Sequence, residues 1–547
     1  MLLGIGILVL VLINVVAHRF VYRIDLTEEK RYTISEATKD LLRDLEDVVY
    51  VEVYLEGEFP AGFQRLQRSV KETLEEFRTF GGKNIQYKFI DPATAKSGKA
   101  RNEFYMGLAQ KGIQPTNLYD TDKGSKIEKL IFPGAVVSYG GNEKGVMLLK
   151  GNMAAKADER LNQSVEGVEF ELASAIRQVI REQRKRVAII DGYGGPDSLQ
   201  LAGLSNALRE NYEVLRVNIS KESLHIYDAI ILARPVKPVS EQDKFKIDQF
   251  IMKGGKALFF IESMEVKGDS IGLEQNYALP YNHNLDDQFF QYGIRINTNL
   301  IQDLTSGAQP VVVGNMGDQP QIRMMPWPFY PVINSFSKHP IVKNLDAIYT
   351  KYISSMDTVK ADGVTKIPLL FTSQYSRVLS APVRVSINDI RGNIQQEAFG
   401  QRFLPVAYLL EGEFSSLYKN RILPRNVSSE NFLASGNSKI LVCSDGDLVS
   451  NEINTRSNQP YDLGYDPYSQ YTFSNKEFVS NALEYLLDEK GLIVARTKEI
   501  KIRPLDKFKV ENERIFWQII NLVLPVVIII IFGISRYYIR KRKYANF

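Results

Sequence analysis

The stretch VAIIDGYGGPDSLQLAGL, residues 187–204, decides the fold. It opens with four apolar residues in a row, which is typical of a strand buried on both faces of a parallel sheet. A glycine-rich turn follows, and Asp197 is placed to cap a helix that carries Leu201, Leu204 and Leu208 on one face. A strand, a tight turn and an amphipathic helix in this order predict the first β-α unit of an α/β sheet.

The same alternation continues along the chain. Further strands are predicted at 214–217, 229–232 and 257–261, and a helical pattern between the last two has Ser240 as its predicted N-cap. A less regular stretch then reads as an inserted or satellite lobe, and the sheet resumes with ILVC at 440–443. Near-continuous apolar strands alternating with helices predict a doubly wound parallel sheet covered on both faces.

A separate α/β unit precedes this sheet. The β-branched run at 48–55, a helical pattern over 63–77 and the alternating run at 85–90 predict a β-α-β unit with a parallel pair of strands. A glycine-rich GGN turn within residues 129–150 predicts a hairpin between a strand at 129–139 and a second strand after it. An amphipathic helix over 165–179 then closes the unit.

Both ends of the chain carry an uncharged apolar run. Residues 1–17 contain no charged side chain and, extended to residue 22, are long enough for a short membrane span; residues 515–534 form a second span. The bases that follow the second span predict a cytoplasmic C-terminus by the positive-inside rule. We therefore expect an inner (cytoplasmic) membrane protein with residues 24–513 in the periplasm.

The charge distribution and the cysteine count exclude several classes of protein. Five of the 68 Lys and Arg follow residue 514, so the rest of the chain has 63 bases against 64 acids, too balanced for a nucleic-acid groove. The single cysteine, Cys443, excludes an intramolecular disulfide framework, and four scattered histidines give no metal-ligand spacing. We expect no metal site.

Motifs for nucleotide binding and catalysis are incomplete. The turn after residue 190 resembles the dinucleotide fingerprint, but Asp197 stands where the third glycine is required. None of the Gly-Lys pairs has the preceding glycine of a Walker A motif, and neither HExxH nor GxSxG occurs. The sequence therefore predicts a protein that is not an enzyme and binds no cofactor.

One candidate ligand crevice remains. Asp191 and Gly192 directly follow one predicted strand of the sheet, and Asp445 follows another. Ligands of open α/β sheets bind outside the carboxyl ends of the strands, so these residues could face one crevice. Turns and helix caps explain such aspartates equally well.

A candidate partner face lies in the second membrane span. Gln518 and Asn521 are three residues apart, and Pro525 continues roughly along the same face. Polar groups within a span favour a protein partner over hydrocarbon, although both side chains could simply lie at the headgroup boundary beside Trp517.

The ordered motifs resemble the GldG family of gliding-motility proteins from end to end. They are DLTEEKRYTIS (25–35), FIDP (89–92), GIQPTNL (112–118), LNQSVEGVEFELASAI (161–176), IIDGYGGP (189–196), PVAYLLEGEF (405–414), IRPLD (502–506) and WQIINLVLP (517–525). The resemblance implies an auxiliary membrane subunit of an ABC transporter, with a GldF-like permease and a GldA-like ATPase as partners. It also implies a flavodoxin- or amidotransferase-like middle domain, similar to one in an intraflagellar-transport protein.

The chain departs from the amidotransferase pattern at the nucleophile. Those enzymes place a cysteine in a Gly-x-Cys-x-Gly turn after a central strand, whereas here the run at 257–261 is followed by Glu262, Ser263 and Met264. The departure favours a binding version of the fold. Two alternatives stay open: a structural scaffold of the envelope machinery, and an envelope hydrolase or amidotransferase-like enzyme that uses Ser263 or Asp191.

The expected organisation has six parts. They are a membrane helix at 1–22, an extracytoplasmic α/β domain at 24–180, an amidotransferase-like domain at 186–490 with an insertion at about 264–437, a stem at 491–514, a membrane helix at 515–535 and a basic cytoplasmic tail at 536–547.

Overall fold

The computed structural model describes most of the chain, in two compact units, Met1–Lys498 and Glu499–Phe547. The described residues are 33–94, 98–122, 125–150, 156–181, 183–267, 276–316, 319–387, 395–425, 432–497 and 512–544. The expected N-terminal membrane helix and most of the expected stem lie outside them.

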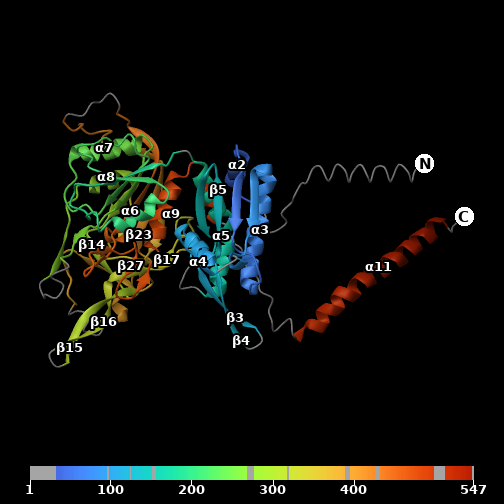
Figure 1. Cartoon of the computed structure of the whole chain (residues 1–547). Helices are drawn as coiled ribbons and strands as arrows, with labels where there is room; N and C mark the ends of the chain where they lie inside the picture. The colour runs from blue at the N-terminus through green and yellow to red at the C-terminus, as the bar shows by residue number, and fades with distance from the viewer. Residues whose placement is uncertain are drawn as a thin grey trace. The chain divides into compact units, whose positions relative to one another are not determined.

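The N-terminal part of the first unit is a four-stranded sheet with the order β2-β1-β5-β6 (Figure 1). Its strands are β1 (Val49–Val53), β2 (Ile85–Phe89), β5 (Gly134–Tyr139) and β6 (Asn142–Met147). β1 and β2 are parallel and joined through helix α3 (Ala61–Gly81), as the sequence predicts. The helix packs on the sheet because Leu66, Val70, Leu74 and Phe77 recur at helical spacing and are all buried.

Three further α-helices and a second hairpin belong to this part. The helices are α2 (Glu36–Arg43), α4 (Gly98–Gln110) and α5 (Ala157–Ile180), and the hairpin consists of β3 (Thr116–Asp122) and β4 (Ser125–Ile131). The predicted single strand over 129–139 is wrong, since β4 ends at Ile131 and β5 begins at Gly134. Pro133 lies at the break and has no N–H to donate to a continuous ladder.

The larger sheet has eight strands in the order β17-β20-β23-β24-β10-β9-β7-β8. Five are parallel: β7 (Arg186–Ile190), β8 (Glu213–Val217), β9 (Ala229–Ala233), β10 (Lys256–Phe260) and β24 (Ser435–Cys443). Numbered among themselves along the chain, these five have the order 2-1-3-4-5. The antiparallel extension is β17 (Ser335–Phe336), β20 (Val364–Phe371) and β23 (Pro405–Ser415).

Helices cover both faces of this sheet. In β7, Val187 and Ile189 belong to one buried cluster with α6 (Ala202–Arg209) and α9 (Asn475–Leu487). Ala188 and Ile190 belong to the opposite cluster with α7 (Glu241–Met252) and α8 (Asp286–Tyr292). Successive residues of a strand point to opposite faces, so burial on both sides requires the continuous apolar run that the sequence contains.

Two predicted helix caps have different outcomes. Ser240 caps α7 as predicted, because its hydroxyl accepts a hydrogen bond from the backbone N of Asp243 at 3.2 Å. Asp197 instead caps a turn before the helix, where its carboxylate accepts from the N–H groups of Leu199 and Gln200, each at 2.8 Å, and α6 begins only at Ala202.

The expected satellite lobe is partly a component of the main sheet. Residues 404–410 were expected in the lobe, but β23 lies between β20 and β24 in the large sheet. Val406, Ala407, Leu409 and Leu410 are almost completely buried there, which accounts for the apolar run.

The remainder of the lobe is built on the hairpin of β15 (Ser306–Met316) and β16 (Gln319–Ile333), and β16 includes the proline-rich segment MMPWPFYP at 324–331. Shorter strands surround the hairpin: β11 (Met264–Glu265), β12 (Tyr277–Pro280), β13 (Ile294–Ile296), β14 (Asn299–Asp303), β18 (Ile348–Tyr349), β19 (Met356–Thr358), β21 (Ser376–Ser380) and β22 (Val383–Arg384). Most of them contribute to an aromatic cluster that includes Trp327, Phe329 and Tyr352, whereas β13 and β19 pack into the cluster that contains α7 and α8.

The start of the expected stem belongs to the folded body. The 3-10 helix η7 (Leu492–Thr497) follows α9, and its Leu492 is buried in the core of the N-terminal part. Ile493 packs against Phe170 of α5. Apolar side chains at the beginning of a charged segment thus join the two parts of the first unit.

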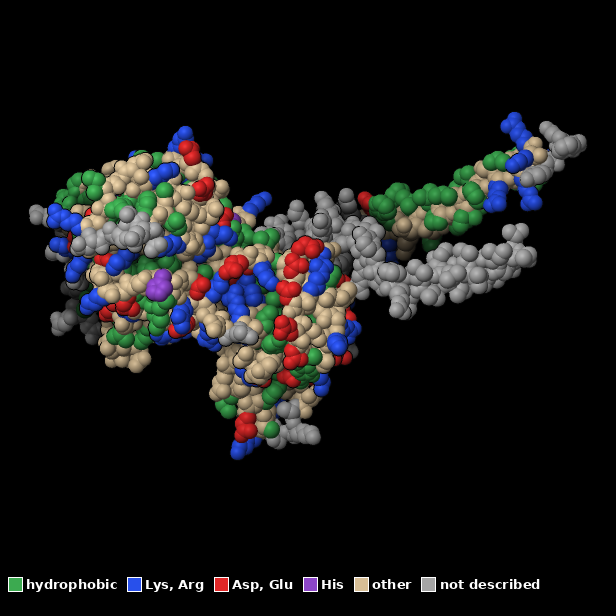
Figure 2. Space-filling model, turned by 90° about the horizontal axis from the view of Figure 1, so that it is seen from above, with side chains coloured by type: hydrophobic (Ala, Val, Ile, Leu, Met, Phe, Trp, Pro, Cys, Tyr) green, Lys and Arg blue, Asp and Glu red, His purple; other side chains and the backbone are tan. Residues whose placement is uncertain are grey.

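The second unit contains the helix α11 (Arg514–Tyr544), which is apolar and long enough to cross a membrane. Figure 2 shows hydrophobic side chains along it and Lys and Arg gathered at one end. The helix continues through Pro525 and includes the bases up to Lys543, so much of the expected tail at 536–547 is helical.

Candidate functional site

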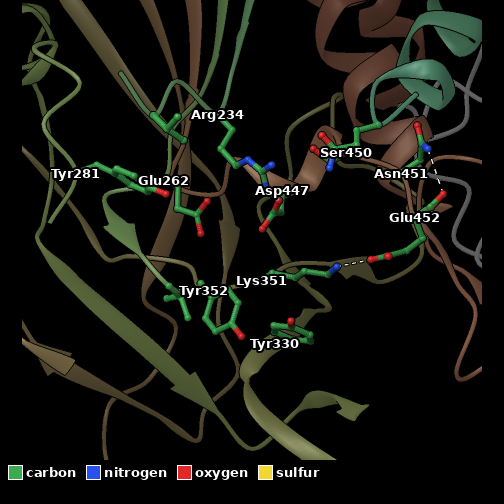
Figure 3. Close-up of a pocket in the computed structure, with 13 residues that line it drawn as sticks. Arg234, Glu262, Tyr281, Tyr330, Lys351, Tyr352, Asp447, Ser450, Asn451 and Glu452 are labelled. Carbon is green, nitrogen blue, oxygen red and sulfur yellow. Dashed lines mark hydrogen bonds and ion pairs between the residues drawn. The ribbon is translucent and has the colours of Figure 1, made fainter. Parts of the chain in front are cut away.

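A pocket of about 390 Å³ opens at the carboxyl ends of β9, β10 and β24 (Figure 3). The sheet contributes Arg234, Glu262 and Asp447, each of which follows one of these strands. The opposite wall comes from the inserted lobe and includes Lys351 and a group of tyrosines, namely Tyr281, Tyr330 and Tyr352. The location is the one at which open α/β sheets bind ligands.

Arg234 is held in a strained conformation at the end of β9. Its φ is 42°, a left-handed value that is costly for a residue with a side chain. Gly446 lies against it, since a Cβ atom there would approach Cγ of Arg234 to 2.6 Å. The guanidinium forms an ion pair with Asp447, while its Nε is buried without a partner among the described residues. The strain positions a charged side chain on the pocket wall.

Glu262 is a buried acid that faces the pocket. It follows β10, is 5% exposed, and its carboxyl group has no hydrogen-bond partner among the described residues. Burial, followed by the charges of Asp447 and Asp445, raises the pKa of Glu262 well above its ordinary value. Burial and the neighbouring acids therefore favour the protonated form of Glu262.

Asp445 lies behind the pocket and is completely buried. Its carboxylate accepts hydrogen bonds from the backbone N–H groups of Lys351, Asp447 and Leu448 at 3.0, 2.8 and 3.1 Å. These donors favour the ionised form, but burial and the charge of Asp447 outweigh them and raise the pKa of Asp445 to about 8. Asp445 thereby ties the loop after β24 to the inserted lobe.

Lys351 extends along the lobe side of the pocket to Glu452, with which it forms an ion pair (Figure 3). Its ammonium group also lies 5.4 Å from the ring centre of Tyr330 and 5.9 Å from that of Tyr349. Burial opposes the charge, but Glu452 and Asp447 together raise the pKa of Lys351, which stays cationic.

The structure separates the residues of the predicted crevice. Asp445 is beside the pocket, but Asp191 and Gly192 follow β7, with β9 and β10 between β7 and β24. The Asp191 carboxylate is half-exposed and pairs with Arg216 at 3.1 Å. Gly192 has a φ of 106°, a value that favours glycine, so the conformation of the turn accounts for a glycine at this position.

Sequence reasoning missed the central residues of the pocket. Arg234 and Glu262 each stand directly after an apolar run, the same signal that pointed to Asp191. Lys351 and the tyrosines carry no such signal, because they reach the sheet edge from the inserted lobe.

The side chains of Ser263, a candidate nucleophile, and of Cys443 are both buried. The Ser263 hydroxyl, 4% exposed, donates to the carbonyl of Asn297 at 2.9 Å and lies 2.5 Å from the Ser354 hydroxyl. Cys443 is 1% exposed, and burial raises the pKa of its thiol. Within the described residues, no group of three His, Cys, Asp or Glu is placed to hold a metal ion.

The candidate partner face lies on α11. Asn521 donates a side-chain hydrogen bond to the backbone carbonyl of Trp517 at 2.9 Å, one turn earlier. Gln518 and Pro525 lie in the same helix, before and after it.

Two family models match most of the chain. A model described as "ABC-type uncharacterized transport system" matches residues 184–482, and a domain of unknown function matches residues 28–138. An uncharacterized protein of Borreliella burgdorferi is 22% identical over 541 residues, covering 96% of this chain and 94% of that protein.

Two solved structures show distant similarity. The mmIFT52 N-terminal domain is 11% identical, with a TM-score of 0.32 over 56% of this chain and 99% of its own. A putative ThuA-like protein from Parabacteroides merdae is 10% identical, with a TM-score of 0.27 over 59% of this chain and 94% of its own. The model that matches residues 184–482 spans more than half of the 547 residues and all eight strands of the large sheet with the pocket at its edge, so the chain belongs to the ABC-type uncharacterized transport system family.

Proposed function

We propose that the chain is a non-enzymatic, membrane-anchored auxiliary subunit of an ABC transporter associated with gliding motility. Membership of the transport-system family supports the transporter role. In this proposal the ATPase is a separate, GldA-like chain that acts with a GldF-like permease, in keeping with the lack of a Walker A motif in the sequence. The pocket at the sheet edge carries the proposal of a binding subunit, since it brings charged and aromatic side chains together at the carboxyl ends of the strands.

The proposed location is the inner membrane, with the body of the chain in the periplasm. An apolar helix with its bases at the C-terminal end supports this orientation. The middle domain is proposed to be a flavodoxin- or amidotransferase-like fold that has lost its catalytic cysteine. The 2-1-3-4-5 order of the parallel strands supports this assignment, because it is the order of flavodoxin-type doubly wound sheets.

Co-purification tests the proposal. The full chain, tagged at its C-terminus and extracted from membranes in mild detergent, is expected to retain a permease and an ATPase through purification. Recovery of the intact, inserted chain without either protein would contradict a transporter role and favour a scaffold.

Replacing residues 515–534 by polyleucine of equal length tests the docking face on α11. Helices in lipid associate through packing detail and polar contacts, so the variant is expected to insert but to lose the permease. A matched variant keeps Gln518, Asn521 and Pro525 within the polyleucine helix and should restore the complex. Wild-type recovery of the permease by the plain polyleucine chain would show that the helix is only an anchor.

A further inference from the structure

We propose that the pocket after β9, β10 and β24 binds a small organic cation, an ammonium or guanidinium compound, with Glu262 as its counter-ion. This inference rests on the proposed function as a binding subunit and names the chemistry of what is bound.

The first observation is the unsatisfied acid. Glu262 is buried to 5% exposure and, in Figure 3, its carboxyl group points into the pocket rather than toward a protein partner. Among the described residues it forms no hydrogen bond and no ion pair. A buried carboxyl group normally has such a partner, because burying it alone costs several kcal/mol. A ligand bound in the pocket would supply the missing partner of the Glu262 carboxyl group.

The second observation is the charge balance. Both cations of the pocket already have a carboxylate: Arg234 pairs with Asp447, and Lys351 pairs with Glu452. Asp445 behind the pocket has its backbone donors, which leaves Glu262 as an additional acid. An ionised Glu262 would carry a charge that neither cation of the pocket balances, so an anionic ligand would oppose its ionisation, whereas a bound cation would favour it.

The third observation is the nature and size of the walls. Tyr281, Tyr330 and Tyr352 line the pocket, and the rings of Tyr330 and Tyr352 meet edge to face at 5.1 Å and 82°. Aromatic faces attract organic cations, and the approach of Lys351 to Tyr330 shows that this wall accommodates one. A volume of about 390 Å³ suits a small molecule, while the described residues form no ligand set for a metal ion.

Binding should be linked to proton release. Burial raises the pKa of Glu262, and the charges of Asp447 and Asp445 add to this effect against the opposing charges of Arg234 and Lys351, so the pocket without a ligand favours the protonated acid. Tyr281 also faces this group, and burial and Glu262 raise its pKa to about 12, so it stays neutral. A bound ammonium group favours the carboxylate, and the proton of Glu262 passes to the buffer.

Calorimetric titration of the full chain in detergent tests the proposal. The probes are n-butylammonium, choline and argininamide, with glucose as a neutral probe and butyrate as an anionic probe. Each titration is run near neutral pH in two buffers of different ionisation enthalpy. We expect at least one of the cations to bind and to release on the order of one proton, while glucose and butyrate show no binding.

The matched variants are Glu262→Gln and Glu213→Gln. The first keeps the shape of the side chain and is expected to weaken cation binding about tenfold or more and to abolish proton release. The second changes a glutamate of β8 that pairs with Arg186 on the surface, and should behave as wild type.

Binding of glucose or butyrate but of no cation would overturn the inference, as would no binding by any probe, or cation binding that Glu262→Gln leaves unchanged. The co-purification described above is a separate readout. A chain that retains its permease and ATPase but binds no cation refutes only the ligand class. A chain that binds a cation but has no transporter partner refutes only the proposed function.

Discussion

The guanidinium group of Arg177 in α5 lies 2.9 Å from Oδ1 of Asp488, the residue that follows α9. Arg177 also forms an ion pair with Glu484, which lies in the last turn of α9. Both partners of the first pair are largely buried, with side-chain exposures of 13% and 2%. This ion pair joins the N-terminal sheet to the large sheet, although the two residues are 311 positions apart.

Arg177→Ala should destabilise the body of the chain. The change leaves the buried carboxylate of Asp488 without its cation, at a cost of about 3–5 kcal/mol. The control is Lys490→Ala, which removes an exposed pair with Asp44 between the same two parts and should cost less than ~1 kcal/mol. Thermal unfolding of the detergent-solubilised full chain measures both. Equal, small shifts for the two variants would show that the buried pair does not hold the parts together.

Glu262→Gln should stabilise the ligand-free protein at alkaline pH. Glu262 and Asp445 have raised pKa values, so the native state binds more protons than the unfolded state, and stability falls as pH rises above their ordinary pKa range. Removing the Glu262 acid should raise the unfolding free energy at about pH 8, with little change near pH 4, where the carboxyl group is largely protonated in both states. Thermal melts across this range check the slope; parallel curves for the variant and the wild type would contradict it.

Cys443→Ser should leave the transporter function intact. The thiol packs in the sheet core at 1% exposure, and a polar replacement there should cost roughly 1 kcal/mol. In the folded wild-type chain the thiol should not react with an aromatic disulfide reagent, and on unfolding a single thiol should appear. A folded but inactive serine variant would indicate a nucleophilic or redox role.

The membrane orientation can be read from protease protection. A protease added outside the inner membrane should digest residues 24–513 and spare an epitope placed in the tail from Arg536, because the bases after the span retain the C-terminus in the cytoplasm. An epitope in the body serves as the internal control. Protection of the body with loss of the tail epitope would reverse the proposed topology.

The sequence by itself determined the local architecture. Continuous apolar runs such as that of β7 predict parallel strands, and the 3.6-residue spacing in α3 predicts its buried face, because both follow from the geometry of short segments. The apolar composition of α11 predicts a candidate membrane span in the same way. Ser240 predicts the start of α7, since capping depends on only a few neighbouring residues.

Only the tertiary structure decided which strand ends and loops meet at the edge of the large sheet. Periodicity shows that a strand is buried but not which strand lies beside it. For this reason the sequence places β23 in the lobe and Asp191 in one crevice with Asp445, whereas the strand order of the sheet separates them. Lys351 and Tyr330 reach the pocket from an insertion, with no local signal of that contact. The unsatisfied state of Glu262 is likewise a property of the assembled pocket, because burial and charge there are set by residues distant in the chain.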